Sequence, residues 1–304
     1  MLFGLRAHQT RQKTAARQSS NKHFLAIAQQ TNKPSFTSKS YNDTMGQVVF
    51  IGLGLDSERG ISLEGLEEAQ RAERVFAEFY TNLMPNFNVE RLQQRIGRAV
   101  RILTRKELED DNGKEIVNSA EHGDVVFLVP GDPMIATTHV SLRLALAKKG
   151  IPSRIIHGAS IVSAVCGATG LQSYKFGKSI TFPQRGQDVP SSVMETIREN
   201  KERGLHTLLL LDLQAGAREQ LNIRDVLSRM TRADPSIEHW LGIGIARIGA
   251  TNELVKAGKV SSLIEVEFGT TPHTIVFPGK LHFMEEEAIR VLDGALPSDL
   301  EVVP

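Results

Sequence analysis

A short acidic loop between two predicted elements carries the first residues that are suited to bind a ligand. Residues 125–129 (Val-Val-Phe-Leu-Val) form an apolar, β-branched run that predicts a buried strand. The sequence Pro-Gly-Asp-Pro at 130–133 ends the strand, because proline fixes φ and glycine allows turns that other residues resist. A helix is predicted over residues 141–149, with the threonines at 137–138 as its caps. Ligands of open α/β sheets bind beyond the carboxyl ends of strands, so we interpret this loop, with Asp132, as a binding loop.

Other predicted strands are also followed by residues that offer hydrogen-bond acceptors. Ser160 follows one strand, Asp212 ends another, and the backbone at Ile248 and Gly249 follows a third. Any one of these residues is more common in a solvated turn, but their recurrence at successive strand ends indicates a site. Together with Asp132 they offer many hydrogen-bond acceptors and few cations. Such a set suits a positively charged ligand without phosphate, and S-adenosylmethionine, with its sulfonium and ammonium groups, has that chemistry.

The sequence Gly-Leu-Gly-Leu at 52–55 is half of a dinucleotide-binding fingerprint. The third glycine, which would open a helix towards a pyrophosphate, is missing. Asp56 and Glu58 also put negative charge where a phosphate needs positive charge. These residues argue against a dehydrogenase, and a GxxxxGK[ST] phosphate loop is absent from the sequence.

The composition of the chain further narrows the possible classes of protein. The formal charge is +1, but residues 1–44 hold seven Lys or Arg and one Asp, a net +6, which leaves −5 for the rest of the chain. This acidic body argues against binding to nucleic acid through bulk charge. Cys166 is the one cysteine, so no intrachain disulfide can form, and the nine histidines lack a metal-ligand spacing, so we expect no metal. The apolar runs are too short to cross a bilayer, and we expect no membrane contact.

Residues 1–44 differ from the rest of the chain. They are rich in Gln, Ser, Thr, Asn and Lys with little apolar periodicity, which predicts a disordered extension. Their Arg and Ser content and their scarcity of acids also fit an organelle transit peptide. Alternatively, Met45 is the true start, since it directly precedes the first strong strand pattern, and the upstream segment is not native.

Strand and helix patterns alternate from residue 47 onwards, which predicts an α/β fold with a mostly parallel sheet covered on both faces. A composition break at residues 171–187 separates two halves. The predicted strands are residues 47–51, 74–79, 100–103, 125–129, 153–158, 206–213, 242–249 and 273–277. The predicted helices are residues 61–72, 89–96, 106–110, 116–121, 141–149, 160 to 167 or 170, 190–203, 223–230 and 285–292, with Ser160 and Asn222 as caps.

Seven short segments share the pattern of one known family. They are residues 51–55 (IGLGL), 76–81 (FAEFYT), 130–139 (PGDPMIATTH), 160–161 (SI), 174–178 (YKFGK), 204–208 (GLHTL) and 278–282 (PGKLH). The chain resembles the diphthine synthase family over residues 47–284. The Gly-Asp-Pro loop alone would indicate only the wider tetrapyrrole-methylase-like superfamily of class III methyltransferases, whereas 76–81 and 174–178 are more specific. Residues 1–44 match nothing in the family pattern.

The resemblance implies a fold and a cofactor. It implies two α/β domains of the tetrapyrrole methylase type, at 45–158 and 159–304, with the active site in the cleft between them, and a homodimer. It implies that S-adenosylmethionine binds folded in that cleft as a co-substrate. The family commonly has a smaller residue at the position of Ile248, so we expect a backbone contact there. Carried over motif by motif, the cofactor contacts are Leu55, Asp132, Ile135, Ser160, Ile161, Leu211, Ile248 and His273.

The resemblance also implies a protein substrate. The family methylates elongation factor 2 repeatedly, at the amino group of a 3-amino-3-carboxypropyl-histidine, giving diphthine in diphthamide biosynthesis; some relatives also esterify the carboxylate. We expect a cytoplasmic location, because that substrate works in the cytosol. Lys175, Lys178 and Arg185 are our candidates to meet the carboxylate of the substrate. Asp132 and Asp212 are our candidates to accept the proton of the amine.

Three alternatives stay open. Another class III methyltransferase would act on a corrinoid or on ribosomal RNA, although the acidic body and the specific segments argue against both. A non-catalytic binding module would keep the fold, although the intact motifs at 131–133 and 160–161 argue against such decay. A dehydrogenase is weakened by the missing phosphate-binding glycine.

Overall fold

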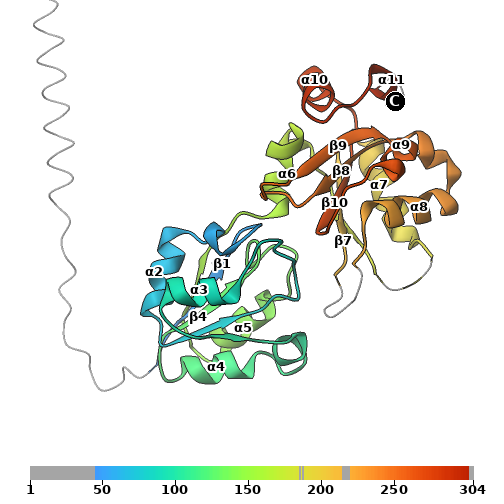
Figure 1. Cartoon of the computed structure of the whole chain (residues 1–304). Coiled ribbons are helices and arrows are strands. Elements are labelled where there is room, and N and C mark those ends of the chain that lie inside the picture. The colour runs from blue at the N-terminus through green and yellow to red at the C-terminus, as the bar shows by residue number, and fades with distance from the viewer. Residues whose placement is uncertain (1–44, 185, 187, 214–219, 301–304) are drawn as a thin grey trace, which may run out of the picture. The chain divides into compact units, whose positions relative to one another are not determined.

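The computed structural model describes residues 45–184, 186, 188–213 and 220–300, all within the second of the chain's two units, residues 44–304. Figure 1 shows the elements of this unit. The predicted extension at residues 1–44 lies outside the described residues. Two five-stranded sheets with helices on their faces make up this unit, which confirms the predicted α/β class. The boundary between residues 158 and 159 stays a prediction.

The first sheet consists of parallel strands alone, in the order β3-β2-β4-β1-β5. Its elements are β1 (Val48–Gly52), η1 (Glu58–Gly60), α2 (Leu63–Arg71), β2 (Arg74–Ala77), α3 (Val89–Ile96), β3 (Val100–Ile102), η2 (Lys106–Asp110), α4 (Lys114–Ala120), β4 (Val125–Val129), α5 (Val140–Lys148) and β5 (Ser153–Ile156). Phe50 and Phe127 pack with α4 and α5, whereas Ile51 and Leu128 pack with α2 and α3. Burial on both faces explains the continuous apolar runs, and the parallel order places all five carboxyl ends at one edge.

The second sheet has the order β6-β7-β10-β8-β9. Its elements are α6 (Ile161–Thr169), η3 (Ser173–Lys175), β6 (Ile180–Phe182), α7 (Ser191–Glu202), β7 (Thr207–Leu211), α8 (Ile223–Ala233), η4 (Pro235–His239), β8 (Leu241–Ala246), β9 (Leu254–Lys259), α9 (Val260–Glu265), β10 (His273–Phe277), α10 (Phe283–Leu292) and α11 (Pro297–Leu300). Helices α7, α8 and α9 cover one face with Ile275, and α6 and α10 cover the other with Val276.

The prediction of a mostly parallel arrangement is wrong for this second sheet. Only β6 and β7 pair in parallel; β10 runs antiparallel to both of its neighbours, and β9 runs antiparallel to β8. A short turn after Ala246 joins β8 directly to β9, so the chain reverses without a crossover helix. The edge strand β9 was not predicted, because the lysines and the glycine in Leu-Val-Lys-Ala-Gly-Lys at 254–259 weaken the strand pattern.

Four of the predicted helix ends can be compared with the structure. Ser160 precedes α6 and the left-handed Gly170 ends it, and the Asn222 side chain accepts from the amide of Asp225 at the start of α8, as predicted. The predicted threonine caps of α5 are wrong, since this helix starts after His139. The hydroxyl of Thr137 instead donates to the carbonyl of Pro133, at 2.9 Å, within the loop itself. None of the described helices is long and apolar enough to span a membrane.

Candidate functional site

Three glycine-containing loops interlock at the carboxyl edge of the first sheet. Gly54 and Gly131 exchange two backbone hydrogen bonds, of 3.2 and 2.7 Å, which join the loop after β1 to the loop after β4. A Cβ atom on Gly158 would lie 2.3 Å from the carbonyl oxygen of Gly131 and 2.9 Å from Cα of Gly52, so only glycine fits at this contact. Because the Gly54 amide bonds to protein, it is not offered to a phosphate, which agrees with the weak dinucleotide fingerprint.

The carboxylate of Asp132 holds these loops in place. Its Oδ1 atom accepts from the amide of Met134, at 2.9 Å. Its Oδ2 atom lies 2.7 Å from Nδ1 of His157 and accepts from the amide of Gly158, at 3.3 Å. Both carboxylate oxygens therefore have protein partners, and the carboxyl group itself is buried. Asp132 is thus suited to shape the site rather than to pick up and release a proton.

A cavity of about 470 Å³ opens at the strand ends and is lined from both sheets. This volume is in the range of roughly 300–1,000 Å³ that is usual for small-molecule sites. All eight residues predicted to contact the cofactor line it: Leu55, Asp132, Ile135, Ser160, Ile161, Leu211, Ile248 and His273. Asp212, which follows β7, lines it as well. Residues more than 200 positions apart in the sequence thus meet around one space, as the resemblance implied for the cleft.

The second sheet contributes a wall that Arg247 fixes. This residue is buried with φ of 52°, and its guanidinium donates to the carbonyls of Asn252, Phe268 and Thr270. These bonds hold the segment that leads into β10, and therefore His273, against the cavity. Although Arg247 lines the cavity, its donors are already used by the protein.

His273 is a neutral residue with both ring nitrogens occupied. Its Nδ1 atom accepts from the amide of Ile223, at 3.3 Å, and its Nε2 lies 3.1 Å from the carbonyl of Thr270. Burial, with a contribution from the Arg247 guanidinium, lowers the pKa of His273 to about 4. A ligand can therefore meet its ring surface or its backbone, but not a free imidazole nitrogen.

The sequence analysis did not assign a role to several lining residues that follow β2 and β3. These are Tyr80, Thr81, Asn82, Leu83, Arg105 and Glu109. Thr137 and Thr138, which were predicted only as helix caps, also line the cavity. Tyr80 and Thr81 lie in the family-specific segment 76–81, to which no role was attached. Arg105 and Glu109 come just after the third predicted strand, and that position beyond a strand end was the available signal.

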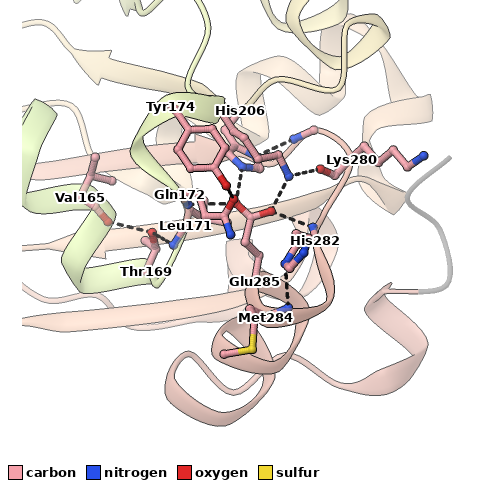
Figure 2. A network of polar contacts seen from close by, with 12 residues as sticks. Val165, Thr169, Leu171, Gln172, Tyr174, His206, Lys280, His282, Met284 and Glu285 are labelled. Atoms are coloured by element: carbon pink, nitrogen blue, oxygen red, sulfur yellow. Dashed lines mark hydrogen bonds and ion pairs between the residues drawn. The ribbon is translucent and has the colours of Figure 1, made fainter.

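Lys175 and Lys178, two of the three basic residues proposed to meet the substrate carboxylate, are not among the residues that line this cavity. The ammonium of Lys175 binds the buried carboxylate of Glu285 and the carbonyl of Lys280, in the polar network that surrounds Glu285 (Figure 2). Lys178 is not among the residues that line the cavity, and Arg185 lies outside the described residues. Within the described ranges, no cluster of three or more His, Cys, Asp or Glu is arranged to hold a metal ion.

The fold and the cavity together define a class of protein. Residues 47–264 match the family described as Tetrapyrrole (Corrin/Porphyrin) Methylases. The two sheets of the chain, with a cavity at their strand ends, form the tetrapyrrole methylase fold. The chain is therefore a methyltransferase of this class, which uses S-adenosylmethionine as co-substrate.

Individual relatives narrow the class. The diphthine synthase of Methanocella arvoryzae is 42% identical over 252 residues, which cover 81% of this chain and 98% of the relative. The diphthine synthase of Methanocaldococcus jannaschii is 40% identical over 255 residues, with coverages of 81% and 98%. A crystal structure of a diphthine synthase matches with a TM-score of 0.79 at 38% identity, covering 85% of this chain and 100% of that chain. The chain belongs to the diphthine synthase family, whose S-adenosylmethionine-dependent methylation is a step of diphthamide biosynthesis.

Proposed function

We propose that this enzyme methylates the amino group of a 3-amino-3-carboxypropyl-histidine on elongation factor 2, repeatedly, to give diphthine. The observation that carries the proposal is the cavity at the strand ends, because all eight predicted cofactor contacts line it. Its loops carry the carboxylates of Asp132 and Asp212. Among the described residues, the second sheet contributes Arg247 to the lining, and its guanidinium is bonded to backbone carbonyls. Such a lining suits a cationic methyl donor better than a phosphate-bearing cofactor.

The reaction itself needs little covalent participation by the protein. The bound S-adenosylmethionine supplies a sulfonium methyl group: the nitrogen–carbon bond forms as the carbon–sulfur bond breaks, and the amine must first lose a proton. The contribution of the chain is to align the amine and the methyl group, which is worth on the order of several kcal/mol. Asp132 is committed to the loops by bonds to both of its oxygens, so it acts in positioning rather than as the base.

The enzyme acts as a homodimer in this proposal. Five large apolar side chains on α10 and just after it are more than half exposed: Phe283, Met284, Val291, Leu292 and Leu296. A second copy of the chain is the partner that would bury them. Sedimentation of the purified protein tests this point; replacing Val291 and Leu292 with Asp should convert a dimer into monomers, and a monomeric wild type would contradict it.

The protein substrate places the enzyme in the cytoplasm, where elongation factor 2 works. The charge of −5 outside residues 1–44 disfavours ribosomal RNA as an alternative substrate. Neither a nucleic acid nor a membrane is needed for the proposed reaction.

One assay tests the proposed function. Purified protein is mixed with methyl-labelled S-adenosylmethionine and with elongation factor 2 that carries the 3-amino-3-carboxypropyl-histidine precursor. We expect label on this factor and none on a matched factor whose histidine is unmodified, with mass spectrometry counting the methyl groups. Label on a corrinoid or on ribosomal RNA, with none on the factor, would favour another class III methyltransferase and overturn the proposal.

A further inference from the structure

The lining of the cavity includes a compact set of charged and polar side chains from the segments that follow β2, β3 and β4. The guanidinium carbon of Arg105 lies 5.1 Å from the centre of the Tyr80 ring. Nε of Arg105 lies 3.8 Å from Oε1 of Glu109, and the hydroxyl of Thr138 donates to the same Glu109 oxygen, at 3.2 Å. All four residues line the cavity. A cation, a carboxylate and two hydroxyls therefore lie together at one place in the site.

Arg105 differs from the other cation of the cavity in being available. The described lining residues include two arginines, and Arg247 uses its donors on backbone carbonyls. Arg105 makes no hydrogen bond to any described residue, and its 3.8 Å separation from Glu109 is too long for one. Its side chain is 56% exposed, at the cavity, so its five N–H donors can reach a ligand.

Tyr80 offers a second unused donor. The residue is 6% exposed, and its hydroxyl has no hydrogen-bond partner in the part of the chain that the structure describes. The Thr138 hydroxyl lies nearby but outside hydrogen-bond geometry. Burial and the nearby carboxylates of Glu78 and Glu109 raise the pKa of Tyr80, so its hydroxyl stays a donor at neutral pH. A buried polar group without a partner is destabilising, and a ligand that accepts a hydrogen bond from it would remove this cost.

Local hydrogen bonds hold both residues in position. The buried Glu78 accepts from the amides of Tyr80 and Thr81, at 2.9 and 3.0 Å, and this fixes the turn that leads out of β2. Glu107 accepts from the amide and the hydroxyl of Thr104, both at 2.7 Å, and this fixes the turn that places Arg105. The positions of Tyr80 and Arg105 are therefore fixed by hydrogen bonds within the two loops that carry them.

We propose that Arg105, Tyr80 and Glu109 form a subsite for an α-amino-acid head group, in which Arg105 and Tyr80 bind the carboxylate and Glu109 binds the amine. The guanidinium fork matches a carboxylate, and the phenol adds a hydrogen bond. The Glu109 carboxylate, fixed by the Thr138 hydroxyl, attracts an ammonium and accepts its proton before methyl transfer.

Two molecules of the proposed reaction carry such a head group, namely the 3-amino-3-carboxypropyl chain of the acceptor and the methionine part of the cofactor. The sheet order favours the acceptor, an assignment that rests on the proposed function. Strands β3 and β2 lie at one edge of the first sheet, and none of the eight predicted cofactor contacts follows either of them. The exposure of Arg105 also suits a side chain that enters from a large protein.

The test compares Arg105→Gln and Tyr80→Phe with Lys106→Gln, which removes a cation from the exposed neighbouring position. Calorimetry gives the Kd for S-adenosylhomocysteine and for methylthioadenosine, which lacks the amino-acid head. Methylation of precursor-bearing elongation factor 2 gives KM and kcat. For Arg105→Gln we expect a KM for the factor at least tenfold higher, with the Kd for S-adenosylhomocysteine within twofold of wild type. Tyr80→Phe should raise KM severalfold and Lys106→Gln should change nothing.

The outcomes distinguish the acceptor from the cofactor as the source of the head group. They also distinguish a failure of the subsite from a failure of the proposed function. If Arg105→Gln weakens S-adenosylhomocysteine but not methylthioadenosine, the head group bound there is that of the cofactor, and the subsite stands. If KM and both Kd values stay within twofold of wild type in Arg105→Gln and in Tyr80→Phe, the subsite is overturned while the proposed function remains. A wild-type protein that binds S-adenosylhomocysteine but leaves the factor unlabelled overturns the proposed function and the acceptor assignment together. Thermal unfolding confirms that each variant is folded.

Discussion

The Oδ2 atom of Asp132 lies 2.7 Å from Nδ1 of His157, across the gap between the loops that follow β4 and β5. The two partners differ in their surroundings, because the Asp132 side chain is 6% exposed and the His157 side chain is 70% exposed. The carboxylate also accepts from the amides of Met134 and Gly158. The loop connection therefore depends on Asp132 much more than on His157.

Replacing Asp132 with Ala should accordingly do more harm than replacing His157 with Ala. Asp132→Ala leaves two amides without their acceptor, so we expect a loss of about 1–3 kcal/mol in the free energy of unfolding. We also expect at least tenfold weaker binding of S-adenosylhomocysteine. His157→Ala removes an exposed pair, which is worth about 1 kcal/mol or less. Urea unfolding and calorimetry measure both effects; equal losses in the two variants would contradict the assignment.

Gly158→Ala should damage the same loops by steric overlap. The added methyl group would lie 2.3 Å from the carbonyl oxygen of Gly131, a distance that forces the backbone to shift. We expect about 1–3 kcal/mol of destabilisation and more than tenfold weaker binding of S-adenosylhomocysteine. Gly167→Ala in α6 is the matched control, because a Cβ there meets no atom within 4 Å. It should stabilise the protein by about 0.5–1 kcal/mol. Unchanged cofactor binding in Gly158→Ala would show that the loops need not interlock.

Local sequence patterns predicted the parts of the site that follow buried strands. Residues 125–129 are apolar and β-branched, so the strand and the position of Asp132 beyond it could be inferred from sequence alone. The resemblance then supplied contacts such as Leu211 and Ile248, and both line the cavity. Residues that end a strand and residues in a strong motif were therefore within reach of sequence reasoning.

The pairing of distant residues could not be inferred in this way. Tyr80 and Arg105 are 25 positions apart, and only the adjacent placement of β2 and β3 brings the ring to the guanidinium. The antiparallel second sheet was missed because the edge strand β9 is rich in lysine and glycine. Lys175 was assigned to the substrate, although its partner Glu285 lies 110 residues away. Each of these features depends on contacts between segments that local patterns do not connect.

The buried carboxylate of Glu285 should make an acid-sensitive contribution to stability. Burial alone would raise its pKa, but hydrogen bonds from Lys175, from the amides of Gln172 and His282, and from His206 outweigh burial and lower the pKa to about 2 (Figure 2). A lowered pKa stabilises the fold above the unfolded value near 4.5, and this stabilisation is lost as the pH falls towards 2. Glu285→Gln should cost about 3 kcal/mol at pH 7.

Urea unfolding of wild type and Glu285→Gln between pH 7 and pH 2 measures this contribution. The difference in the free energy of unfolding should be nearly constant down to pH 4.5 and should shrink below it, because the wild type then loses the charge that the variant lacks. A difference that stays constant down to pH 2 would contradict the lowered pKa of Glu285.

Asp293 should show the opposite pH dependence. It follows α10 and is buried, and its Oδ2 atom has no hydrogen-bond partner among residues 45–184, 186, 188–213 and 220–300. Burial raises its pKa to about 7, and Lys256 offsets only part of this effect. Because the folded pKa lies above the unfolded value of 3.8, the fold binds the proton more tightly, and stability falls as the pH rises from about 4 to 7. Above pH 7, Asp293→Asn should therefore be more stable than wild type by about 1–3 kcal/mol, and this advantage should vanish near pH 4.

Asp110→Asn, at an exposed position, makes the same charge change and should alter stability by about 0.5 kcal/mol or less at either pH. Chemical unfolding of the three proteins at pH 4 and pH 8 decides the matter: an Asp293→Asn variant that is less stable than wild type at pH 8 would mean that the carboxylate is stabilised, not strained, in its buried position.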